Sequence, residues 1–191
     1  MPSEQVPLHV FEPRYRELIG ECLTEGREFG LVLEDEHGRR EVGTRAGVIE
    51  VLEVFDDGRM NVVVEGRERF RLIELTAGRS FLTAEVEPVA DEKDPVSKDV
   101  VDRAQTLFRR LAEAAEADVD EPEEPAAALS FALAARIDFG VELRQELLEL
   151  RSERERLLRL AELMERAIGA IEREREVRER ASGNGKVSPT P

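Results

Sequence analysis

The stretch Pro7-Leu8-His9-Val10-Phe11-Glu12-Pro13-Arg14-Tyr15-Arg16 decides how the first part of the chain folds. The apolar residues ahead of Glu12 predict a strand. Pro13 suits the first turn of a helix, because its missing N–H needs no partner there. Apolar residues recur at helical spacing from Tyr15 to Leu23, and Gly26 ends the segment. We therefore expect a strand, a turn and a helix, with the Glu12 carboxylate favoured at the helix N-terminus.

Short β-prone runs fill the rest of residues 1–90. They lie at 29–33, 42–55, 60–64, 69–75 and 81–86, with a hairpin loop expected at 34–40 and a turn at Asp57-Gly58. We expect Gly66 to separate two of these strands, and Gly43 and Gly47 to allow a bend or bulge. Five or six short strands with tight turns predict a small, curved or closed β-structure.

Residues 91–181 have helical periodicity instead. Asp94-Pro95 is typical of a helix start, and 126–136 is apolar nearly all round, as in a buried helix. Ser152 and Glu155 have the spacing of a capping box, which predicts two helices, at 142–150 and from 153 onward. The acidic segment 112–125 is interpreted as a solvated connection rather than a docking segment. The polar residues 182–191 are expected to be a disordered tail.

The second of these helices carries an apolar seam from Leu157 to Ile171. The seam spans about two heptads, fewer than the three or four that a coiled coil usually requires. We therefore expect it to be covered inside a helical bundle of the same chain, which favours a monomer. A partner-assembly or adaptor module that uses these helices is the alternative.

Composition excludes several classes of protein. The 191 residues carry a formal net charge of −15, spread over both halves, which opposes binding to nucleic-acid phosphates. The longest stretch without a charged residue, 125–135, has 11 residues, short of the about 20 that a membrane span needs. No basic n-region followed by an apolar h-region opens the sequence, so we expect no signal peptide, and the single Cys22 cannot form an internal disulfide. These features predict a cytoplasmic protein.

No catalytic or metal-binding motif emerges from the sequence. His9, His37 and Cys22 lack the spacing of zinc ligands, and Cys22 lies on the apolar helix stripe, where we expect a buried thiol. No serine lies in a nucleophile elbow. Residues 183–186 (GNGK) lack the spacing of a phosphate-binding loop. We expect no enzymatic activity, no metal and no cofactor.

The segment PLHVFEPRYREL resembles the signature of the Lon substrate-binding domain, the N-terminal domain of ATP-dependent Lon proteases, which also occurs as a stand-alone protein. The segments 29–33, 42–44, 65–71, 82–86, 145–149 and 155–157 are similar to later family segments in the same order, so the resemblance covers about residues 6–172. The signature residues are Pro7, Leu8, His9, Phe11, Glu12, Pro13, Arg14, Tyr15, Gly66, Arg69 and Phe70. We expect them to determine the fold rather than to contact a ligand.

The resemblance implies an α+β fold: a PUA-like β pseudobarrel with one inserted helix (1–90), followed by a C-terminal α-helical bundle (91–181). It also implies a non-catalytic module that binds unfolded or tagged protein segments, in a cleft between barrel and helices, and that can act beside a protease or chaperone. The ATPase and peptidase domains of the full protease do not fit in this chain. No catalytic or cofactor-binding residue can be carried over, and the substrate-binding residues are left unassigned.

Two points complicate the comparison with the family. Family members begin with an apolar strand before the PLH segment, whereas only 1–5 precede Val6 here. We expect either an upstream start or a barrel without its first strand, which would leave an unpaired sheet edge. PUA-like barrels can also bind RNA, and Arg67, Arg69 and Arg71 alternate on one predicted strand, where they would share a face. The negative net charge makes this RNA-binding alternative the weaker one.

Overall fold

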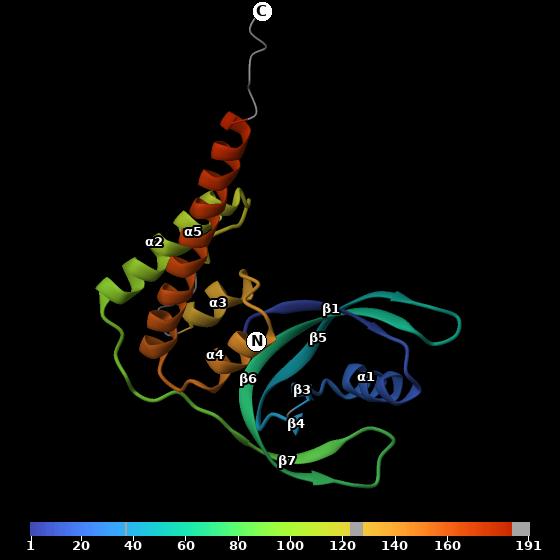
Figure 1. The fold of residues 1–191 in the computed structure, drawn as a ribbon. Coiled ribbons are helices and arrows are strands. Elements are labelled where there is room, and N and C mark those ends of the chain that lie inside the picture. Colours follow the sequence, from blue (N-terminus) through green and yellow to red (C-terminus); the bar gives the residue numbers. More distant parts are fainter. Residues whose placement is uncertain (37, 123–127, 185–191) are drawn as a thin grey trace, which may run out of the picture. The chain divides into compact units, whose positions relative to one another are not determined.

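The computed structural model describes residues 1–36, 38–122 and 128–184, and only the backbone for Ala181–Asn184 (Figure 1). The strands are β1 (Gln5–Val10), β2 (Phe29–Leu31), β3 (Glu34–Asp35), β4 (Gly38–Arg39), β5 (Val42–Val54), β6 (Met60–Thr76) and β7 (Thr83–Pro88). The helices are α1 (Pro13–Glu25), α2 (Lys98–Ala115), α3 (Leu129–Ala135), α4 (Val141–Glu149) and α5 (Glu153–Asn184). This architecture confirms the predicted α+β class. The predictions for His37 and for 185–191 lie outside the described residues.

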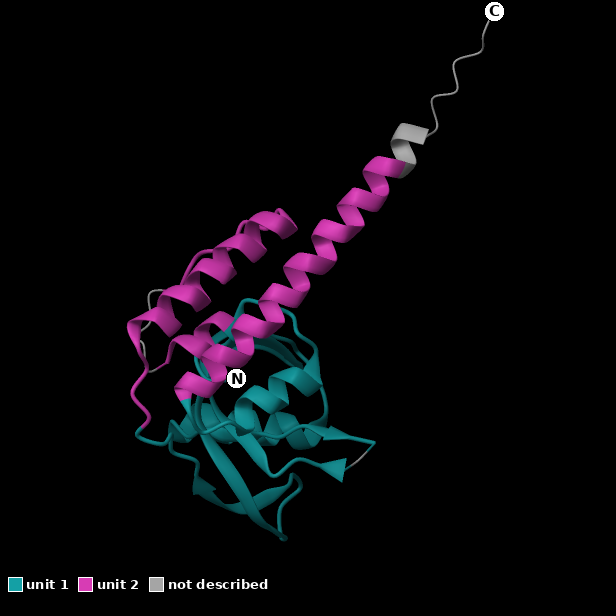
Figure 2. Cartoon of the chain, turned by 60° about the vertical axis from the view of Figure 1, so that its left-hand side comes forward, with its two compact units in different colours: residues 1–93, 134–152 teal, residues 94–133, 153–191 magenta. Residues whose placement is uncertain are grey.

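The chain divides into two compact units (Figure 2). Unit 1 comprises Met1–Lys93 and Ala134–Ser152, and unit 2 comprises Asp94–Leu133 and Glu153–Pro191. The sequence suggested one helical part over 91–181, whereas the segment with α4 belongs to the unit of the strands. The contacts of this segment, described below, give the physical reason.

Unit 1 is built on an antiparallel sheet in the order β1-β6-β5-β2, with β7 paired to the far end of β6. β6 pairs with β1 through Met60–Glu65, with β7 through Phe70–Thr76, and with β5 on its other side. The core lies where α1 covers the sheet, with Ile19 and Cys22 of the helix packed among Val62, Val64 and Ala46. Burial of Cys22 confirms the sequence prediction.

β6 is one continuous strand, so the predicted break at Gly66 is wrong. Gly66 N–H donates to the Glu4 carbonyl, and the Gly66 carbonyl accepts from Ser3 N–H, both at 2.8 Å. A Cβ at Gly66 would lie 1.9 Å from the Met1 carbonyl oxygen. The glycine is therefore needed for a close backbone approach inside a strand, not for a turn.

A second close approach positions Phe70, whose side chain is buried on β6. Its ring lies against the backbone of Gly30 in β2 and Gly43 in β5. A Cβ would meet the Phe70 Cζ atom at 2.9 Å and 2.7 Å, respectively. The two strands can therefore close over the ring only because both positions lack a side chain.

Arg69 connects β6 to the end of α4. Its side chain is only 4% exposed. Nη1 donates to the carbonyls of Leu148 and Leu150 at 2.8 and 2.7 Å, and Nη2 donates to Asp91. Carbonyls at a helix C-terminus have no partner within the helix, and a cation there complements the helix dipole. Arg69 thus supplies both donors and charge, which explains why α4 belongs to unit 1.

Further hydrogen bonds attach the same helix to the strands. Gln145 Nε2 donates to the Val42 carbonyl at 3.1 Å, and Arg144 pairs with Glu4. Beyond the helix, Arg151 Nε donates to the Ala90 carbonyl at 3.2 Å. The predicted separation of α4 from α5 is confirmed.

Unit 2 contains α2 and α5 side by side, running in the same direction (Figures 1 and 2). Arg103–Glu165 and Arg175–Glu116 ion pairs join early and late parts of the two helices, at 2.9 and 2.7 Å. The seam side chains Leu157, Ala161, Met164 and Ile168 are buried. The seam is therefore buried within unit 2, where α2 packs along α5, as expected. The monomeric state itself stays a prediction.

A buried polar cluster joins α3 to the first turn of α5. The Glu153 carboxylate accepts hydrogen bonds from the N–H and the hydroxyl of Ser130, at 2.8 and 2.6 Å. The fully buried Arg156 pairs with Glu153 at 2.7 Å, and its guanidinium lies 4.3 Å from the Phe131 ring centre. Arg156 is a core residue although it is charged, because the adjacent Glu153 carboxylate neutralises its guanidinium.

Helix boundaries follow the predicted pattern in α1, which starts at Pro13 and has Gly26 as its left-handed C-cap residue. α2 starts later than expected, at Lys98 with Ser97 as N-cap residue, so the predicted start at Asp94-Pro95 is wrong. α5 extends to Asn184, past the position where the tail was expected to begin.

Substituting Gly43→Ala should destabilise unit 1 by about 2–3 kcal/mol, because the new Cβ overpacks against Phe70 and the Leu31 carbonyl. Gly20→Ala in α1 is the matched control, since no atom lies within 4 Å of its Cβ and alanine favours a helix. Urea unfolding followed by circular dichroism measures both. Equal stability of the two variants would contradict the role given to Gly43.

Replacing Arg69 by Met should cost about 3 kcal/mol, because two helix C-terminal carbonyls and Asp91 lose a buried donor. Arg67→Met, two residues along β6, removes an exposed cation paired with Glu28 at 3.1 Å and should cost at most about 1 kcal/mol. Amide hydrogen exchange should show earlier opening of α4 in the Arg69 variant alone. Unchanged exchange in α4 would refute this assignment.

Candidate functional site

The signature segment has a buried side and an exposed side. Val10 enters the core, as do Ile19 and Cys22 directly after the segment. The exposed residues are Pro7, His9, Phe11, Pro13, Arg14 and Tyr15, and Leu8 and Glu12 are half-buried. Gly66, Arg69 and Phe70 are buried. Their contacts, described above, are those of residues that hold the fold. The exposed signature residues keep their fold-determining role as a prediction.

Three of the exposed or half-buried rings form an aromatic surface, defined as His9, Phe11 and Phe55. His9 stacks on Phe11 with ring centres 6.0 Å apart and meets Phe55 edge-on at 6.1 Å. His9 Nδ1 and Asn61 Oδ1 are 2.7 Å apart, which orients the imidazole. Phe11 is 59% exposed, so its ring is available to a ligand.

α1 lies between two β-hairpins, as Figure 1 shows. Arg16 donates to the Asp57 carbonyl at the tip of the β5–β6 hairpin. Glu17 accepts from Ser80, and Glu21 pairs with Arg79, both at the tip of the β6–β7 hairpin. Both tips are therefore tied to one helix.

The β6–β7 hairpin has one apolar face that other residues leave largely uncovered. Leu72 lies opposite Val86, and Leu75 opposite Ala84, with a bulge at Ile73 between the two pairs. The apolar hairpin face is defined as Leu72, Leu75, Leu82, Ala84 and Val86. Leu75, Leu82 and Val86 are 44%, 63% and 37% exposed, although the same face continues into the buried Phe70. Contiguous exposed apolar surface is a candidate interaction site.

The opposite face of this hairpin is acidic. Glu74 lies directly opposite Glu85 across the strand pair, and Arg71 lies opposite Glu87, which it approaches at 3.6 Å. Like charges directly opposite each other are destabilising in a sheet. Among the residues that the structure describes, neither Glu74 nor Glu85 has a cationic partner. The acidic hairpin face is defined as Glu74, Glu85 and Glu87.

The alternating arginines do not form a basic face, which corrects that expectation. Arg69 is buried against α4, Arg67 pairs with Glu28, and Arg71 pairs with Glu41 at 2.9 Å. Each positive charge is neutralised, so the RNA-binding alternative loses its structural basis.

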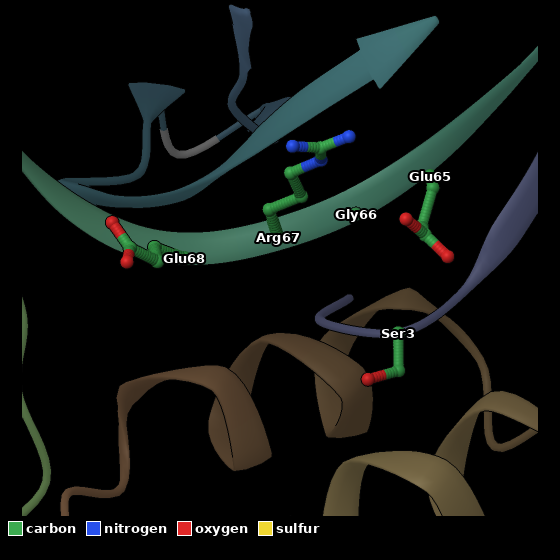
Figure 3. A pocket seen from close by; sticks show the side chains of 5 residues that line it. All are labelled: Ser3, Glu65, Gly66, Arg67 and Glu68. Atoms are coloured by element: carbon green, nitrogen blue, oxygen red, sulfur yellow. The ribbon is translucent and has the colours of Figure 1, made fainter. Parts of the chain in front are cut away.

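Two surface hollows lie along β6 and share Arg67. One, of about 560 Å³, is lined by Ser3, Glu65, Gly66, Arg67 and Glu68. Figure 3 shows that its side chains do not converge, since Arg67 points away from Ser3. The other, of about 180 Å³, lies beside the C-terminus of α1 and includes Cys22. Neither hollow brings together a nucleophile, a base and an oxyanion donor.

Two further properties of the described residues bear on catalysis and metal binding. Burial raises the pKa of the Cys22 thiol, which disfavours the nucleophilic thiolate. No group of three or more His, Cys, Asp or Glu side chains is placed to hold a metal ion within the described ranges. None of the helices described there is long and apolar enough to cross a membrane.

The candidate surface that sequence reasoning missed is the apolar hairpin face. Its signal was present, since apolar and polar residues alternate in 69–72 and 82–86. Alternation identifies two faces of a strand but not which face another element covers. The bulge at Ile73 also shifts the alternation by one residue, so the pattern alone could not pair Leu75 with Ala84.

Comparison with known proteins identifies the family. A family model described as "ATP-dependent protease La (LON) substrate-binding domain" matches residues 1–166. Lon protease 1 of Hydrogenovibrio crunogenus is 24% identical over 94% of this chain and 24% of that protein. The Lon protease of Porphyromonas gingivalis is 27% identical over 90% of this chain and 22% of that protein. The chain thus spans about a quarter of the length of these relatives.

Solved structures give the same result. The crystal structure of a Lon N-terminal domain protein from Xanthomonas campestris superposes with a TM-score of 0.65 and 25% identity, covering 84% of this chain and 89% of that one. The N-terminal domain of Mycobacterium avium complex Lon protease shares the fold, with a TM-score of 0.61, 19% identity and coverage of 86% and 91%. With most of its length matched, the chain belongs to the Lon substrate-binding domain family.

Proposed function

We propose that this protein is a non-catalytic module that binds unfolded protein segments on the apolar hairpin face. The observation that carries the proposal is a set of five apolar side chains that no described residue covers completely, four on the paired strands and Leu82 directly before β7. Membership in a substrate-binding family supports a binding role, and the chain matches the substrate-binding domain over about a quarter of the length of the Lon proteases. Unfolded clients expose the apolar side chains that such a face can bury.

The geometry suits an extended segment better than a small molecule. The apolar hairpin face is a strip along two strands, whereas small-molecule sites are concave and enclose most of their ligand. Leu75 and Leu82 are both exposed. Their burial against a client stabilises the complex by about 25 cal/mol per Å² of apolar surface removed from water. A strip of this kind binds apolar side chains in many different sequences. Such broad selectivity is required of a module that binds many unfolded clients.

The test is binding of reduced, carboxamidomethylated lysozyme, which cannot refold, compared with native lysozyme of similar charge. We expect the unfolded form alone to bind. Leu75→Glu should weaken binding at least about tenfold, because it places a charge in the apolar strip. Leu52→Glu is the matched control: Leu52 is 53% exposed on β5, outside the strip.

Circular dichroism should show that both variants remain folded. Loss of binding in the Leu52 variant but not in the Leu75 variant would place the client elsewhere. Equal binding of native and unfolded lysozyme by the wild type would refute a role in recognising unfolded segments.

A further inference from the structure

The free edge of β7 is the part of the hairpin that can still form backbone hydrogen bonds. β7 pairs with β6 and with no other strand of the described chain. Val89 N–H donates to the Arg69 carbonyl at 3.1 Å, so residues 69 and 89 face each other across the ladder. Backbone groups of an antiparallel strand alternate between its two sides. Those of Ala84 and Val86 therefore point away from β6, as does the Pro88 carbonyl.

This edge thus offers two N–H donors and three carbonyl acceptors in a row. The side chains of the same outward-pairing residues, Ala84 and Val86, lie on the apolar hairpin face. The residues between them, Glu85 and Glu87, carry their carboxylates on the acidic hairpin face. A strand added here would consequently meet apolar neighbours on one side and acidic neighbours on the other.

β1, which pairs with the first half of β6 on the same side as β7, has an edge less suited to such pairing. Gly66 N–H donates to the Glu4 carbonyl, and the register Gln5↔Glu65 continues from this pair. By the same alternation, Gln5, Pro7 and His9 of β1 face outward. Pro7 has no N–H and lies in the middle of that edge, a common way of blocking strand addition. In β7 the proline is at the end of the strand.

We infer that β7 binds its client by strand addition, and that the preferred client is an extended segment in which apolar and basic residues alternate. This inference rests on the proposed function and specifies its ligand. The client's apolar side chains lie beside Ala84 and Val86, and its Lys or Arg side chains lie beside Glu85 and Glu87. The facing pair Glu74–Glu85 gains the cation that the described chain does not provide.

Strand addition combines two sources of recognition. Main-chain hydrogen bonds provide affinity without regard to sequence, and alternate side chains provide selectivity through the two faces. An acidic face paired with a basic client also speeds encounter at low salt, since the net charge of −15 attracts cationic segments.

The first experiment uses a synthetic fluorescent nine-residue peptide of alternating Val and Lys and measures its affinity by fluorescence anisotropy. A peptide of the same composition with all Val residues grouped together is the control, and we expect it to bind at least about tenfold more weakly. Replacing every Lys of the alternating peptide by Glu should abolish its binding. Glu74→Gln combined with Glu85→Gln should weaken the dependence of binding on salt. Equal binding of the alternating and grouped peptides would overturn the proposal.

The second experiment tests the hydrogen bonds directly. N-methylation of every second peptide residue should abolish binding for one of the two sets and spare the other, because alternate N–H groups face β7. In the protein, Val86→Pro removes an outward N–H and should weaken binding about tenfold, whereas Val86→Ala keeps it and should weaken binding about threefold or less. Equal effects of both methylated sets would exclude strand addition.

These outcomes separate the inference from the proposed function. If Leu75→Glu abolishes binding of unfolded lysozyme while both N-methylated peptides bind normally, the apolar face binds clients without strand addition. If unfolded lysozyme does not bind at all, the proposed function itself fails. The peptide experiments need no folded variant, so a destabilised Val86→Pro protein would leave the test intact.

Discussion

The buried guanidinium of Arg69 is the interaction on which the arrangement of unit 1 depends. It lies on the central strand and reaches the last carbonyls of a helix that comes 79 to 81 residues later in the chain. Only arginine provides several rigidly oriented donors while staying charged in a buried position; a lysine would offer a point charge without the fork. Because α4 ends on this side chain, the segment Ala134–Ser152 packs with the strands although both its neighbours in sequence belong to unit 2.

The same strand connects this interaction to the proposed binding surface. Phe70, adjacent to Arg69, points to the opposite side of β6 and is enclosed by Gly30 and Gly43. Beyond Phe70, β6 continues for six more residues, and its apolar face passes from the core to solvent. The hairpin is held at its base by Arg69 and Phe70 and at its tip by Glu17 and Glu21 of α1. A strip that is fixed at both ends loses little conformational entropy on binding, which favours affinity.

Local signals predicted the elements well, and long-range contacts explain where prediction failed. Pro13 and Gly26 bounded α1 correctly, and the two helices on either side of residue 151 were expected from Ser152 and Glu155. Gly66 was misread because a glycine needed for close approach looks the same in sequence as one needed for a turn. The burial of Arg156 and Arg69 could not be predicted, because it depends on Glu153, Asp91 and carbonyls whose positions only the fold determines. For the same reason, alternation predicted the strands of the hairpin but not its uncovered face.

For the proposed client binding, the exposed edge of β7 must not pair with the same edge of a second copy. In an antiparallel pair of two β7 strands, Glu85 and Glu87 of one copy would lie near the same residues of the other, on the same face. Like charges at these positions oppose pairing, whereas a basic client neutralises them. Each copy also carries a net charge of −15, which adds long-range repulsion. The negative charge of Glu85 and Glu87 therefore disfavours self-association through this edge. The same charge favours extended segments that carry cations.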